Sequence, residues 1–78
     1  MFYVGNVLWL EESNSWFNIP KNFTGIARTR NGDMRWYSRG GFHRIDGPAI
    51  MDVDGYCEWH YMDRFYGFGL ERPLLFPI

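Results

Sequence analysis

Two glycine-containing turn dipeptides, Asn31-Gly32 and Asp54-Gly55, constrain this chain more than any other feature. Each lies between two short runs of apolar and aromatic residues. Both central residues of a type I′ β-turn need positive φ, and Asn-Gly and Asp-Gly meet that need well. The sequence therefore predicts two β-hairpins, one over residues 24–38 and one over residues 48–61.

Two-residue turns would determine which residues face each other across each hairpin. The predicted cross-strand pairs are Thr29 with Met34, Ala27 with Trp36, Arg28 with Arg35, Asp52 with Cys57, and Ile50 with Trp59. Each hairpin would then have an apolar face that carries one tryptophan. The other face of the first hairpin would be charged, as in an antiparallel sheet with one solvated side. We expect Trp36 and Trp59 to be core residues.

The two hairpins are also related to each other in sequence. A shift of 23 residues places Gly32 on Gly55 and Trp36 on Trp59. An internal repeat of this length is a supersecondary unit that buries its apolar face only against a neighbour. Two imperfect copies predict a short sheet and not a long solenoid.

Residues 36–49 read W-Y-S-R-G-G-F-H-R-I-D-G-P-A. This segment resembles the W-x-x-x-G-x-x-H-R-x-D-G-P-A unit of short β-repeat proteins, many of them from bacteriophages, which are distantly similar to MORN-type repeats. The flanking hairpins extend the similarity to residues 27–67. In the second copy Asp63 replaces the glycine and Tyr66 the histidine, so we expect the array to end there. The resemblance implies a β-repeat scaffold and a phage origin, and it brings no catalytic residues.

The rest of the chain is expected to complete one small domain over residues 1–78. Residues 1–23 would form an N-terminal cap or strand, and the apolar, proline-bounded tail 68–78 would pack back on the hairpins. An aromatic content of 21% lets a short chain bury a useful core. The predicted fold is mainly β: a small antiparallel meander of two related hairpins, with the N-terminal strand and the C-terminal tail packed on it.

Three segments of the sequence suggest chemistry, and each also has a structural interpretation. His43 to Pro48 is interpreted as a structural corner in which His43 or Arg44 pairs with Asp46. The spacing of Cys57 and the two histidines does not match a metal site, so we expect no metal and no cofactor. Residues 2–7 resemble the first RNA-contact strand of an RRM, but Pro20 and Asn31-Gly32 interrupt the helix that an RRM requires. An acid–base site at the His43 to Pro48 corner would need a nucleophile or a second base within reach, and the sequence indicates none. We therefore expect the protein not to be an enzyme.

Charge is distributed unevenly along the chain. Residues 21–44 carry six basic residues and one acid, a net charge of +5, while residues 45–78 carry two basic residues and six acids, a net charge of −4. The predicted partner-binding residues are Arg28, Arg30, Arg35, Arg39 and Arg44, together with Tyr37. Arginine beside aromatic rings suits protein interfaces and phosphate contacts alike.

The expected function is that of a small non-enzymatic, phage-encoded protein that binds a host protein with an acidic surface. We include among the expected roles the inhibition of a host defence complex, as by an anti-CRISPR. The single cysteine is typical of a reducing compartment, here the host cell cytoplasm. The first alternative is a nucleic-acid-binding module that uses the arginine-rich hairpin. The second is a homo-oligomeric structural or assembly protein, of which a homodimer is the simplest form.

Overall fold

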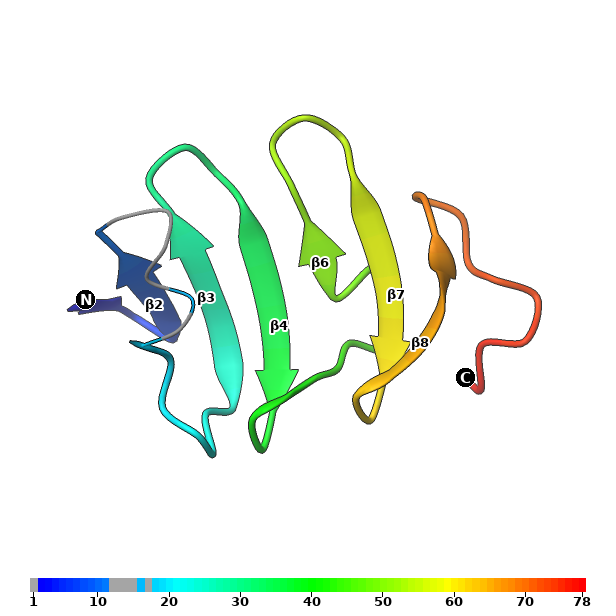
Figure 1. Cartoon of the computed structure of the whole chain (residues 1–78), viewed down its shortest axis with the longest axis horizontal. Coiled ribbons are helices and arrows are strands. Elements are labelled where there is room, and N and C mark those ends of the chain that lie inside the picture. Colours follow the sequence, from blue (N-terminus) through cyan, green and yellow to red (C-terminus); the bar gives the residue numbers. More distant parts are fainter. Residues whose placement is uncertain (1, 12–15, 17) are drawn as a thin grey trace.

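The computed structural model describes residues 2–11, 16 and 18–78. These residues form one eight-stranded sheet and confirm the mainly β fold (Figure 1). The strands are β1 (Phe2–Val4), β2 (Val7–Leu10), β3 (Gly25–Thr29), β4 (Met34–Ser38), β5 (Gly41–Phe42), β6 (Ile50–Met51), β7 (Cys57–Tyr61) and β8 (Arg64–Phe68). Their order across the sheet is β1-β2-β3-β4-β6-β7-β8, and β5 pairs with β4.

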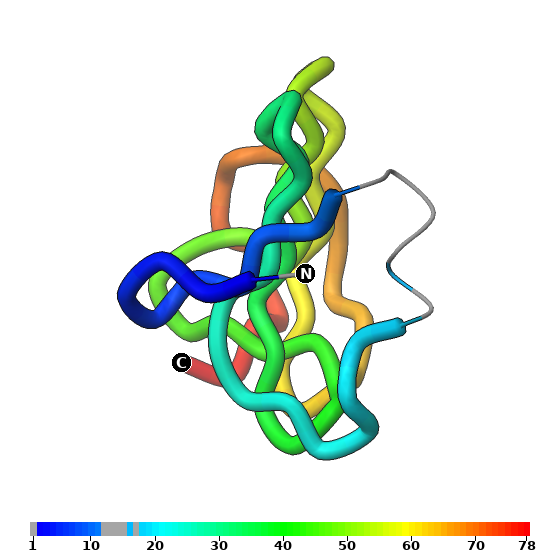
Figure 2. Tube along the Cα trace, turned by 90° about the vertical axis from the view of Figure 1, so that its left-hand side faces the viewer, coloured from blue at the N-terminus to red at the C-terminus, as the bar shows by residue number. Residues whose placement is uncertain are grey.

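One pairing departs from a simple meander. All neighbouring strands are antiparallel except β2 and β3, which run parallel with Leu8 opposite Ala27. Parallel neighbours cannot be joined by a tight turn, so the chain must cross back before β3 begins. Residues 18–23, at the end of this connection, lie on one side of the sheet (Figure 2). The long N-terminal segment therefore supplies the first two strands at one end of the sheet and covers part of one side.

The register of both predicted hairpins is shifted by one residue from the expected one. In the first hairpin Gly32 N–H donates to the Thr29 carbonyl at 3.2 Å, and Thr29 N–H donates to the Asp33 carbonyl at 3.0 Å. The loop therefore has three residues, with positive φ only at its last one, Gly32. The second hairpin closes in the same way, with Gly55 as the last residue of its loop.

This shift corrects every predicted cross-strand pair. The observed pairs are Ile26 with Trp36, Ala27 with Arg35, Arg28 with Met34, Ile50 with Glu58, and Met51 with Cys57. Because facing residues share one side of a sheet, Arg28 and Arg35 point to opposite sides and do not face each other. The sheet therefore does not place these two like charges directly opposite each other.

The registers align into two rows that cross the whole sheet. The row that we use to define face A is Tyr3, Leu8, Ala27, Arg35, Ile50, Glu58 and Phe68. The row that defines face B is Phe2, Trp9, Arg28, Met34, Met51 and Cys57. Each face therefore carries both apolar and charged side chains, unlike the expected sheet with one apolar and one charged side.

Each face is covered over a different half of the sheet. On face A, Leu8, Leu10, Ala27 and Phe23 form a buried cluster over β2 and β3. On face B, the buried Phe76 of the tail packs edge-on against Trp59, with ring centroids 4.9 Å apart. The two covering segments lie on opposite sides of the sheet (Figure 2). Trp59 is a core residue as expected, whereas Trp36 is only half-buried.

Candidate interaction surfaces

The six residues predicted to bind a partner do not lie on one surface. Arg28 belongs to face B, whereas Arg35 and Tyr37 belong to face A. Arg30 is exposed in the β3–β4 loop, and Arg39 is exposed in the turn after β4, where its φ is +52°. The five arginines therefore do not form one positively charged patch.

Arg35 and Tyr37 contribute to the interior of face A. The Arg35 guanidinium lies 4.1 Å from the centre of the Trp16 ring, and its Nε is buried without a hydrogen-bond partner among the described residues. Burial raises the pKa of the Tyr37 hydroxyl, although the nearby Arg35 opposes the shift. Tyr37 also packs edge-on against the buried Phe23, with ring centroids 5.6 Å apart.

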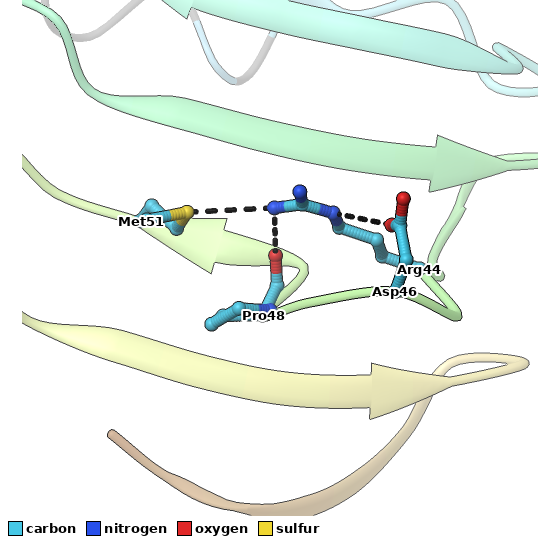
Figure 3. A network of polar contacts seen from close by, with 4 residues as sticks. All are labelled: Arg44, Asp46, Pro48 and Met51. Atoms are coloured by element: carbon cyan, nitrogen blue, oxygen red, sulfur yellow. Dashed lines mark hydrogen bonds and ion pairs between the residues drawn. The ribbon is translucent and has the colours of Figure 1, made fainter. Parts of the chain in front are cut away.

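Arg44 holds the corner between β5 and β6 (Figure 3). Its Nε donates to Asp46 Oδ1 at 2.9 Å, and its Nη1 donates to the Pro48 carbonyl at 3.1 Å. The guanidinium also lies 3.9 Å from the centre of the Trp36 ring. The hydrogen bond and positive charge of Arg44 lower the pKa of Asp46. These contacts agree with the structural interpretation of the corner and leave Arg44 little capacity for a partner.

Arg28 is the predicted residue best placed to meet a partner. Its guanidinium lies 4.0 Å from the centre of the Trp9 ring, and Trp9 stacks on Phe2 with the two planes 7° apart. Val4 lies on the same face beside this stack and is exposed, as is Phe2. We call Phe2, Val4, Trp9 and Arg28 the basic-aromatic patch.

A second surface was not predicted from the sequence. Phe65 and Phe68 are three residues apart, so a regular strand would point them to opposite sides. In β8, however, Phe65 pairs with His60 whereas Gly67 pairs with Trp59, so Tyr66 is an extra residue that forms a β-bulge. The bulge turns Phe65 and Phe68 to the same face, with ring centroids 4.9 Å apart.

Acidic side chains border these two rings on face A. Tyr56 contacts Phe68 with ring centroids 5.9 Å apart, and its hydroxyl donates to Glu58. Glu58 also contacts Nε2 of His60 at 2.8 Å. Burial alone would raise the pKa of Glu58, but these two hydrogen bonds and nearby positive charge outweigh it and lower the pKa. Asp52 lies beside Tyr56, its partner in the hairpin.

We call Asp52, Tyr56, Glu58, Phe65 and Phe68 the acidic-aromatic patch. The only sequence signal for it is the richness of residues 52–68 in rings and acids, which does not reveal the bulge. Without the bulge, an alternating pattern assigns the two phenylalanines to different faces.

The described residues contain neither a pocket nor a group of three or more histidine, cysteine or acidic side chains suited to a metal ion. Cys57 is a free, buried thiol, and burial raises its pKa. Across the described part of the chain, no helix is long and apolar enough to span a membrane. Comparison of the chain with family models, curated proteins and solved structures gave no match.

Proposed function

We propose that this protein is a small non-enzymatic binding protein, encoded by a phage, that recognises an acidic surface of a host protein through its basic-aromatic patch. Inhibition of a host defence complex, in the manner of an anti-CRISPR, is the role that we assign to this binding. The phage origin rests on the resemblance of residues 36–49 to phage β-repeat units.

The arrangement around Arg28 carries this proposal. Its Nε donates to the Thr29 carbonyl at 3.2 Å, and no carboxylate of the described residues forms an ion pair with its guanidinium. Stacking on Trp9 restricts the side chain, which reduces the entropy lost when a partner carboxylate binds. Arginine and tryptophan are also the residues that most often dominate the energy of protein interfaces.

The distribution of charge favours a protein over a nucleic acid. A single-stranded nucleic acid binds along a continuous positive groove in which aromatic rings stack on its bases. Here the arginines of residues 21–44 are divided between the two faces and the loops, and the net charge of the chain is −1. One patch with one or two arginines suits a local acidic site on a protein.

The proposal is tested with two double variants that remove the same charge. Arg28→Ser with Arg30→Ser removes the arginines of the first hairpin, and Arg64→Ser with Arg72→Ser removes two exposed arginines elsewhere. Affinity capture from bacterial lysate should recover one stoichiometric protein with the wild type and with the second double variant. The first double variant should lose it while keeping the wild-type melting temperature.

A salt titration of the purified complex separates the two partner classes. A protein partner should show a modest decrease in affinity between low and physiological salt. Nucleic acid should show log affinity falling against log salt with a slope of roughly 0.7–0.9 per neutralised phosphate. Tight binding of random oligonucleotides at physiological salt, removed by the first double variant, would favour the nucleic-acid alternative instead.

A further inference from the structure

We propose that the acidic-aromatic patch of one copy binds the basic-aromatic patch of a second copy, so that the chain assembles head to tail. The inference shares the basic-aromatic patch with the proposed function but does not require the host target. It rests on the composition, charge and placement of the two patches.

The acidic-aromatic patch is an uncovered part of face A. Phe68 is 66% exposed, Phe65 46% and Tyr56 43%. The three rings are in contact with each other through Phe68 and lie over the last two strands of the sheet. Contiguous exposed rings of this kind, bordered by polar groups, mark sites where another molecule binds.

The carboxylates of this patch favour a positively charged partner. Asp33, Asp54 and Glu58 all lie close enough to Asp52 to act on it, and Arg35 is the positive group that opposes them. Burial raises the pKa of Asp52 above its usual value, and the neighbouring carboxylates raise it further. A guanidinium brought to this patch would relieve that repulsion and contact the exposed ring faces.

The basic-aromatic patch of a second copy has the complementary properties. It presents Arg28 together with the exposed apolar side chains Phe2 and Val4. Arg30 lies on the loop that follows the same strand and adds a second positive charge. A contact between two acidic-aromatic patches would instead bring like charges together, which disfavours a two-fold symmetric dimer through that surface.

The placement of the two patches excludes a contact within one copy. The basic-aromatic patch lies on face B over β1, β2 and β3, and the acidic-aromatic patch lies on face A over β7, β8 and the adjoining part of the β6–β7 hairpin. They are therefore on opposite faces of the sheet. The strands that carry them lie at opposite ends of the sheet (Figure 1). A contact between two such different surfaces is heterologous and repeats from copy to copy, giving a ring or an open chain.

Sedimentation velocity on two complementary variants tests this inference. Asp52→Ser with Phe68→Ser changes the acidic-aromatic patch, and Arg28→Glu changes the basic-aromatic patch. The mean mass of the wild type should rise with concentration and fall when salt is raised from 0.1 M to about 1 M, where the screening length shortens to about 3 Å. Each variant alone should be monomeric at every concentration.

An equimolar mixture of the two variants gives the decisive result. Each variant keeps one intact patch, so the mixture should form a 1:1 dimer that does not grow further. Monomeric wild type at millimolar concentration would overturn the proposal. So would a mixture of folded variants that stays monomeric, or one that grows beyond a dimer.

Two single variants distinguish a loss of self-association from unfolding and from a loss of binding to the host target. Asp52→Asn should melt at or above the wild-type temperature at pH 7, because a carboxyl with a raised folded pKa destabilises the fold when it ionises. Phe68→Ser removes a mostly exposed ring. Both should weaken self-association while still capturing the host target, whereas Arg28→Glu should lose both activities. Self-association that is unchanged in both single variants would also contradict the proposal.

Discussion

Three arginine side chains in this protein pack against tryptophan rings. Arg28, Arg35 and Arg44 each lie about 4 Å from the centre of a tryptophan ring, those of Trp9, Trp16 and Trp36 respectively. The planar guanidinium stacks on the face of an aromatic ring and covers part of its apolar surface. A chain of 78 residues can form only a small core. These contacts shield additional aromatic surface from water.

Two glycines provide a residue-scale prediction. Gly40 and Gly55 both have positive φ, +87° and +98°. A Cβ at Gly40 would lie 1.9 Å from the Lys21 carbonyl oxygen, whereas a Cβ at Gly55 would have no atom within 4 Å. Gly55→Ala should therefore cost only the strain of its φ, about 1–3 kcal/mol. Gly40→Ala should cost more, because the backbone at Lys21 must also move.

Denaturant unfolding of the two glycine variants under identical conditions measures the difference. The hydrogen bond from Gly40 N–H to the Phe23 carbonyl, 2.9 Å long, should be disturbed only in the first variant. Equal losses of unfolding free energy would mean that the contact between residues 21 and 40 is not close in solution.

At the scale of elements, two-residue turns join β1 to β2, β4 to β5 and β7 to β8, and not the strands flanking Asn-Gly or Asp-Gly. The turn between β7 and β8 contains no glycine. Tyr61 pairs with Arg64, and both residues between them have positive φ, +51° at Met62 and +67° at Asp63. Positive φ at both central residues is typical of a type I′ turn, which glycine and asparagine prefer. The turn is held by hydrogen bonds from Phe42 N–H to Asp63 Oδ1 and from Met62 N–H to His43 Nδ1.

Replacing Met62 with a residue suited to this turn should stabilise the protein. Asparagine adopts a left-handed conformation more readily than methionine does, and Met62 is exposed, so little packing is lost. Met62→Asn should raise the unfolding free energy by up to about 1 kcal/mol, or roughly 4–8 °C in melting temperature. Met62→Leu keeps the strain and should melt like the wild type. A lower melting temperature for the asparagine variant would contradict this interpretation of the turn.

At the scale of the whole molecule, stability depends on two segments that cover opposite faces of one open sheet. The tail covers face B through a single anchor, because Phe76 is buried whereas Leu74 is 99% exposed and Leu75 83%. Phe76 contacts the rings of Trp59, Tyr61 and Tyr66. The indole N–H of Trp59 also donates to the Gly69 carbonyl at 2.8 Å, which ties the start of the tail to β7.

The tail therefore provides a whole-molecule prediction. Phe76→Ala should lower the unfolding free energy by about 3–5 kcal/mol, the usual effect of truncating a buried aromatic ring. Leu75→Ala removes an exposed side chain one residue away and should stay within about 0.5 kcal/mol of the wild type. Thermal melts followed by tryptophan fluorescence measure both variants, since Trp59 reports directly on the anchor. Similar melting temperatures for the two variants would show that the tail does not cover the sheet.

The sequence by itself determined the features that depend on a few neighbouring residues. Glycine at positions 32 and 55 ends a tight loop in both hairpins, and Asp46, Gly47 and Pro48 form a corner. The turn dipeptides between short apolar and aromatic runs indicated a mainly β fold, and the tail does pack back through Phe76. These outcomes follow from local backbone preferences, which act over about four residues.

Only the tertiary structure decided the register, the parallel β2–β3 pair, the bulge at Tyr66 and the separation of the arginines onto two faces. A loop of two or three residues can close around the same Asn-Gly pair, and that single residue moves every side chain of one strand to the other face. The choice depends on packing between distant parts of the chain, such as Leu8 against Ala27 and Phe76 against Trp59. Both interaction patches depend on that choice, because each unites residues from strands that only the folded sheet places side by side.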